Sequence, residues 1–130
     1  MNDSEIFDLL NDVIDRLNAV RGTHIILVEG KNDIRALEAV GVKGDFHCIQ
    51  STGGPLKAAE YVWSQGKQAV ILTDWDRKGG IIARDLRENL ASLDVKYDDR
   101  IRADMAFCCR PYAKDVESLD KVYSMIQQKA

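Results

Sequence analysis

Three acidic residues follow two short apolar segments of the chain. Glu29 comes directly after HIILV at residues 24–28, and Asp74 and Asp76 come shortly after QAVIL at residues 68–72. In an extended segment, side chains at positions i and i+2 point the same way, so Asp74 and Asp76 can share an ion. Carboxylates without a counter-charge repel one another, and Mg²⁺ prefers one or two carboxylates together with water and phosphate oxygens. The spacing therefore predicts a Mg²⁺ centre for phosphate chemistry, with Mn²⁺ as a substitute ion.

The hydrophobic pattern predicts the elements that would bring these carboxylates together. It predicts strands at residues 24–28, 46–49, 68–72 and 104–109, and helices at residues 4–20, 32–40, 55–65, 81–92 and 115–128. Alternating strands and helices are typical of an α/β fold with a mainly parallel sheet and helices on both faces. Ligands of such sheets bind beyond the carboxyl ends of the strands, where the three acidic residues would lie.

Length, composition and charge fit one globular domain over residues 1–130. The chain is 45% apolar and 30% charged, with a net charge of −3. No apolar run approaches the roughly 20 residues that span a bilayer, and the acidic N-terminus lacks the features of a secretory signal. We therefore expect a cytoplasmic protein without a membrane partner. Its three cysteines have neither disulfide nor zinc spacing, and nucleic acid would bind at local basic patches.

Two motifs of the chain together resemble those of the Toprim domain family. They are ILVEGKND at residues 26–33 and ILTDWDRKGG at residues 71–80, and the resemblance covers about residues 22–120. The family includes topoisomerases, bacterial-type primases and nucleases, and this chain is most similar to its small stand-alone prokaryotic members. The resemblance implies a Rossmann-like three-layer sandwich of about four strands. It also implies that Glu29 acts as general acid or base and that Asp74 and Asp76 bind Mg²⁺.

Basic residues recur at the predicted edge that carries the carboxylates. Lys31, Arg77 and Lys78 each stand within two positions of an acidic site residue, and we predict that they contact substrate phosphates. Ordinary solvated loop charge is the alternative explanation for each. Further basic residues follow other predicted strands: Lys57, Arg110 and Lys114.

Further acidic and aromatic residues accompany the two motifs. Asp33 is predicted to cap or start the helix after Glu29, in a segment where Toprim proteins often carry an acid. Asp115 and Glu117 open the predicted last helix, where acids interact favourably with the helix dipole, or they add carboxylates around the metal. Trp75, between the two aspartates, is predicted to pack against a helix rather than to stack on a base.

The motifs predict Mg²⁺-dependent phosphodiester chemistry on RNA or DNA, of the nuclease, nicking or strand-transfer type. The sequence shows neither the domain that gives topoisomerases their nucleophilic tyrosine nor the template-binding domains of primases. The alternative is therefore a non-catalytic, metal-dependent nucleic-acid-binding or adaptor module that works with a partner protein.

Other phosphate-binding classes fit the sequence less well. A P-loop would require glycine where Ile25 stands, and no G-x-G-x-x-G pattern follows the first predicted strand. A haloacid-dehalogenase-type phosphatase would carry Thr or Val where Lys78 stands.

Overall fold

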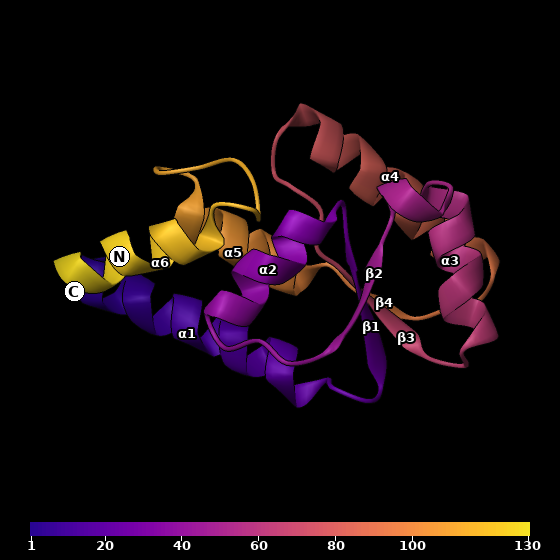
Figure 1. Ribbon diagram of the computed structural model, residues 1–130, viewed down its shortest axis with the longest axis horizontal. Helices are drawn as coiled ribbons and strands as arrows, with labels where there is room; N and C mark the ends of the chain where they lie inside the picture. The colour runs from indigo at the N-terminus through magenta and orange to yellow at the C-terminus, as the bar shows by residue number, and fades with distance from the viewer.

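The computed structural model describes all 130 residues and contains six α-helices and four strands (Figure 1). None of the helices combines the length and the apolar character that a membrane crossing requires. In chain order the elements are α1 (Asp3–Ala19), β1 (His24–Val28), α2 (Lys31–Ala39), β2 (Asp45–Cys48), a short 3-10 turn (Gln50–Thr52), α3 (Pro55–Ser64), β3 (Gln68–Ile71), α4 (Arg77–Ser92), β4 (Tyr97–Asp98), α5 (Arg100–Cys109) and α6 (Leu119–Lys129).

The four strands form one parallel sheet in the order β2-β1-β3-β4. Helices α3 and α4 lie on one side of this sheet, and α1, α2, α5 and α6 lie on the other (Figure 1). All four strands therefore have their carboxyl ends at the same edge, which is uppermost in Figure 1. This arrangement confirms the predicted α/β sandwich with a parallel sheet and helices on both faces.

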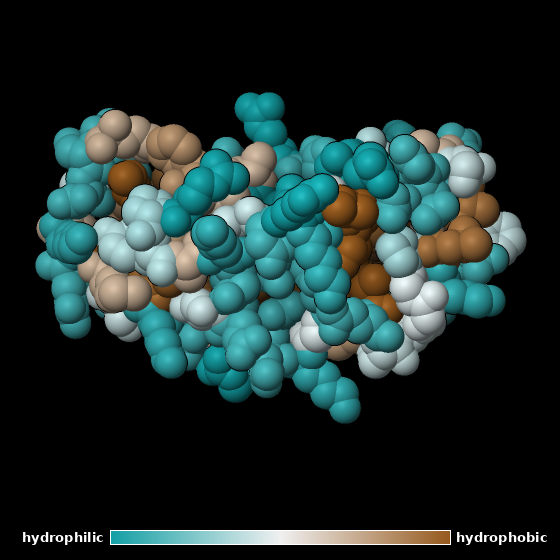
Figure 2. All heavy atoms as spheres, turned by 90° about the horizontal axis from the view of Figure 1, so that it is seen from above, coloured by the Kyte–Doolittle hydropathy of each residue, from teal (hydrophilic) through white to brown (hydrophobic).

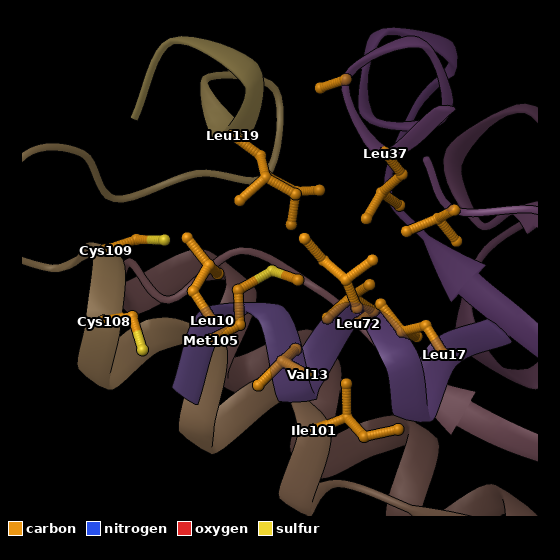
Figure 3. Close-up of a cluster of buried hydrophobic side chains, with 14 of the residues drawn as sticks. Leu10, Val13, Leu17, Leu37, Leu72, Ile101, Met105, Cys108, Cys109 and Leu119 are labelled. Carbon is orange, nitrogen blue, oxygen red and sulfur yellow. The ribbon is translucent and has the colours of Figure 1, made fainter. Parts of the chain in front are cut away.

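The two central strands, β1 and β3, are buried on both faces. Successive side chains of a strand point to opposite faces, so each strand serves two cores. The residues that face α1, α2, α5 and α6 are Ile26, Val28, Val70 and Leu72. Figure 3 shows part of this core, where Leu72 lies among side chains from α1, α2 and α5. The residues that face α3 and α4 are Ile25, Leu27, Ala69 and Ile71. Burial on both faces explains why these strands read as continuous apolar runs.

The fourth strand lies earlier in the chain than the pattern predicted. β4 is only Tyr97–Asp98, and the predicted strand at residues 104–109 is wrong because these residues belong to α5. The Asp98 carboxylate accepts 2.9 Å hydrogen bonds from the main-chain N–H groups of Arg100 and Ile101, which starts the helix directly after the strand. A short apolar run such as DMAFCC fits a buried helix as well as a strand.

Two helices begin more than one residue away from the position that the pattern predicted. Helix α4 begins at Arg77 rather than at residue 81, because the Asp76 carboxylate caps it by accepting a 2.7 Å hydrogen bond from the N–H of Gly79. Helix α6 begins at Leu119 rather than at residue 115, and the preceding residues form a separate turn.

The connection from β3 to α4 makes a tight turn, in which the main chain of Gly79 lies close to the main chain of Asp74. The buried Thr73 donates a 2.8 Å hydrogen bond from its hydroxyl to the carbonyl of Gly79. A Cβ atom at Gly79 would overlap the main-chain carbonyl of Asp74, whereas a Cβ at Gly80 would meet nothing within 4 Å. Glycine is therefore required at position 79 by the close approach of Asp74, and not at position 80.

Replacing Gly79 by Ala should destabilise the protein, because the added methyl group forces the Asp74 backbone out of place. We expect a loss of about 1 to 3 kcal/mol in the free energy of unfolding, measured by urea denaturation. Gly80→Ala is the matched control and should gain about 0.5 to 1 kcal/mol, since alanine favours a helix interior. Equal effects of the two substitutions would contradict the proposed close contact.

Candidate metal centre at the carboxyl edge of the sheet

Glu29 and Asp74 meet at the carboxyl ends of the two central strands. They are 45 positions apart in the chain, but β1 and β3 are paired, with Leu27 opposite Ile71. The Glu29 side chain is buried, and its Oε2 accepts a 2.8 Å hydrogen bond from the main-chain N–H of Asp74. Figure 2 looks onto this edge from above, and hydrophilic residues cover its middle.

Each of the three predicted carboxylates is oriented by one main-chain N–H group. Besides the bond to Glu29, Asp74 Oδ1 accepts a 2.9 Å hydrogen bond from the N–H of Val116, and Asp76 Oδ1 accepts one of 2.7 Å from the N–H of Gly79. No other N–H group donates to the second oxygen of any of the three, and the Glu29 and Asp74 carboxyl groups lie close enough to hydrogen-bond to each other when Glu29 is protonated. These oxygens are not sealed in the interior either, so they are available to a ligand.

A polar pocket of about 220 Å³ opens beside Glu29 and Asp74, and no hydrophobic residue lines it. Its lining brings together four carboxylates and one lysine from the predicted site. The lining residues are Glu29, Gly30, Lys31, Asn32, Asp33, Gln50, Asp74 and Glu117. Four other predicted site residues lie outside this lining: Asp76, Arg77, Lys78 and Asp115.

The carboxyl groups of the pocket are difficult to ionise together. Burial, together with the negative charges of Asp74 and Asp76, raises the pKa of Glu29 from 4.5 to about 7. Burial also raises the pKa of Asp33 to about 6 and holds the pKa of Asp74 above its usual range. Burial and mutual repulsion thus disfavour the ionised forms of these groups, and a bound cation would favour them.

The donor set fits an ion that keeps much of its water. No three His, Cys, Asp or Glu side chains are gathered closely enough to enclose a metal ion. Mg²⁺ does not need such a cage, because it prefers one or two carboxylates with water and substrate phosphate oxygens. Single open oxygens on Glu29, Asp74 and Asp76 are compatible with that preference.

Two of the three remaining acidic residues have structural partners of their own. Asp33 Oδ2 accepts a 3.1 Å hydrogen bond from the N–H of Gly30 at the start of α2, as predicted for a capping residue. Asp115 Oδ1 accepts a 2.9 Å bond from the N–H of Ser118 and so orders the turn before α6. Glu117 is exposed at the pocket, and its charge contributes to the raised pKa of Asp33.

The basic residues divide into one at the pocket and two beside it. Lys31 is the exposed first residue of α2 and lines the pocket. Arg77 and Lys78 are exposed in the first turn of α4, directly after Asp76. All three side chains are exposed, and none is engaged in a protein ion pair.

Trp75 packs into the protein, as the sequence predicted. Its ring is buried, its Nε1 donates a 2.8 Å hydrogen bond to the carbonyl of Ala113, and its main-chain N–H donates one of 3.1 Å to the carbonyl of Lys114. These bonds fix the segment before α6 against the β3–α4 connection. That position allows the N–H of Val116 to reach the carboxylate of Asp74.

Arg102 is the part of the site that the sequence did not reveal. Its half-buried guanidinium donates hydrogen bonds to two consecutive main-chain carbonyls, 3.0 Å from Nε to Thr73 and 2.7 Å from Nη2 to Asp74. Recognising the helix that follows Asp98 would have placed Arg102 near this edge. No local motif marks the residue itself.

Comparison with known proteins agrees with this class of α/β domain, in which acidic residues end two adjacent parallel strands. The family model described as Toprim domain matches residues 24–106, and the chain belongs to the Toprim domain family. Toprim domains generally bind Mg²⁺, and membership indicates a metal-dependent function connected with nucleic acids.

Two similar archaeal proteins and one solved structure support the assignment. A UPF0292 protein of Methanocaldococcus jannaschii is 34% identical over 119 residues, covering 92% of this chain and 93% of the relative. A UPF0292 protein of Methanosarcina barkeri is 32% identical over 134 residues, covering 99% and 93%. A solved protein from Aquifex aeolicus shares the fold, with a TM-score of 0.67 and 23% identity over 83% of this chain and 95% of that chain. The names of these proteins state no activity.

Replacing Glu29 by Gln should stabilise the metal-free protein at about pH 8. The pKa of Glu29 is about 7 in the folded protein and near 4.5 in the unfolded chain, so stability falls as the pH rises between these values. Gln removes this fall, and its amide oxygen can still accept the hydrogen bond from Asp74. We expect a gain of about 1 to 2 kcal/mol after allowance for solvent screening, and none at about pH 4.

Urea denaturation in EDTA at the two pH values measures this effect. Glu38→Gln is the matched control, because Glu38 is exposed on α2, and it should change the free energy of unfolding by less than about 0.5 kcal/mol at either pH. A Glu29→Gln variant that is no more stable than the wild type at the higher pH would contradict the raised pKa.

Proposed function

We propose that this protein carries out Mg²⁺-dependent phosphodiester chemistry on RNA or DNA, of the nuclease, nicking or strand-transfer type. The observation that carries the proposal is the pairing of Glu29 and Asp74 at one strand edge. One carboxylate is buried and hydrogen-bonded to the backbone of the other residue, and each has a second oxygen that receives no main-chain hydrogen bond beside a polar pocket.

Glu29 is the group suited to move a proton. A general acid or base works best when its pKa lies near the operating pH, and burial places the pKa of Glu29 at about 7. Its Oε2 is held by the N–H of Asp74, which fixes the orientation of the carboxyl group, and no main-chain N–H donates to its Oε1. Glu29 can therefore take a proton from an attacking hydroxyl or water, or return one to the leaving oxygen.

Asp74 and Asp76 would hold the Mg²⁺ ion through the oxygens that the backbone leaves free. Bound there, the ion would neutralise the charge that develops on a phosphate during transfer. Neighbouring phosphates of the nucleic acid would be bound by Lys31 at the pocket and by Arg77 and Lys78 in the first turn of α4. Such contacts would fix the position of the nucleic-acid strand on the protein. These contacts are independent of base identity.

One feature of the pocket favours the second candidate, a non-catalytic nucleic-acid-binding or adaptor module. No hydrophobic residue lines the pocket, and the side chain of Trp75 is packed in the hydrophobic core. The pocket therefore has no aromatic side chain on which a base could stack. Substrate selection would then depend on another surface or on a partner protein. The same experiment separates the two candidates.

Purified protein incubated with labelled RNA and DNA, with and without Mg²⁺ or Mn²⁺, should cleave or rejoin one of them only when metal is present. Glu29→Gln should lower the rate by about 100-fold or more, because it removes the proton-transfer group. Binding, followed by fluorescence anisotropy, should remain, and Glu38→Gln should retain full activity. Wild-type activity in Glu29→Gln would contradict the catalytic role. Metal-dependent binding without any turnover by the wild type would instead favour the binding module.

A further inference from the structure

The brevity of β4 leaves the end of β3 without a partner on one side. β4 pairs only Tyr97 with Ala69 and Asp98 with Val70, after which the chain turns directly into α5. The residues after Val70 therefore extend beyond the paired part of the edge. Main-chain carbonyls in such a half-buried position need hydrogen-bond donors from elsewhere in the protein.

Arg102 supplies these donors from the first turn of α5. Its Nε donates to the carbonyl of Thr73 at 3.0 Å and its Nη2 to the carbonyl of Asp74 at 2.7 Å. A guanidinium is rigid and planar, so it can bridge two acceptors at fixed positions, which a lysine ammonium cannot do in the same way. Arg102 thus replaces the strand residues that β4 lacks at this point.

The hydrogen bond from Arg102 is one of three that hold Asp74 in place. The N–H of Asp74 is bonded to Glu29, its side chain to the N–H of Val116, and its carbonyl to Arg102. Of these three partners, only Arg102 anchors Asp74 to α5. We propose that Arg102 is a positioning residue of the metal centre, which holds the Asp74 main chain so that the free oxygens of Asp74 and Glu29 face one cation. This inference rests on the proposed function.

Because Arg102 is positively charged, the direction in which its substitution changes cation affinity tests the proposal. The guanidinium lies close enough to Glu29 and Asp74 for their charges to act on it, and the charge of Arg110 acts on it as well. If Arg102 affected the site only through its charge, removing it would remove repulsion and tighten cation binding. If Arg102 acts by positioning, the same substitution weakens cation binding.

Mn²⁺ binding, followed by electron paramagnetic resonance well below the melting temperature of each variant, separates these cases. Arg102→Lys keeps the charge but loses the two-point contact, and Arg102→Met loses both. We expect the Kd for Mn²⁺ to rise by about 10-fold or more in both, as is typical when a group that orients a metal ligand is removed. Arg110→Met, from an exposed residue of the same region, should leave the Kd within about twofold of the wild type or tighten it.

Amide hydrogen exchange distinguishes positioning from a general loss of stability. The N–H of Asp74 should lose protection in Arg102→Lys, while the N–H of Leu72, which is bonded to the carbonyl of Leu27, should keep it. Wild-type Mn²⁺ affinity, or unchanged protection of Asp74, in Arg102→Lys would overturn the proposal. If the wild type itself bound no Mn²⁺, the proposed function would fail, and the protection of Asp74 would still test the role of Arg102 separately.

Discussion

The hydrogen bond from the main-chain N–H of Asp74 to the Glu29 carboxylate is the contact on which the site depends. It forms because β1 and β3 are paired neighbours, which places residues 45 positions apart in the chain side by side. The surrounding structure maintains this contact from several directions. Gly79 permits the close turn after β3, Trp75 fixes the segment before α6, and Arg102 holds the outer edge of the strand.

Burial of the Glu29 carboxylate lowers the stability of the folded protein, and it also gives the group a pKa that suits proton transfer. A carboxyl group with a raised pKa destabilises the folded protein once the pH is high enough to ionise it. Burial raises the pKa of Glu29, Asp33 and Asp74 alike. The metal-free protein therefore loses stability when these groups, all at the same edge of the sheet, become ionised. A cation at this edge would offset this loss, and a carboxyl with a pKa of about 7 is well suited to proton transfer. Burial of the carboxyl groups thus accounts both for the lower stability of the metal-free protein and for the suitability of Glu29 for proton transfer.

The sequence was sufficient to predict the central strands and the acidic residues that follow them. Both strands are buried on two faces, and such strands produce continuous apolar runs that are easily recognised. The same criterion failed at residues 104–109, because a buried helix can produce an equally continuous run. It also gave no indication of Arg102, whose role depends on how far β4 extends. Asp76 was predicted as a metal ligand, and the structure adds that it caps α4, so one side chain has both a structural and a proposed chemical task.

The response of thermal stability to Mg²⁺ tests most directly whether this edge is a metal centre. A ligand that binds only the folded state raises the melting temperature as its concentration increases. The wild type should therefore melt at progressively higher temperature with added Mg²⁺. The double variant Asp74→Asn with Asp76→Asn should not respond, whereas Asp8→Asn with Asp15→Asn, two exposed acids on α1, should behave like the wild type. An equal response to Mg²⁺ in the wild type and in the Asp74, Asp76 double variant would contradict the account.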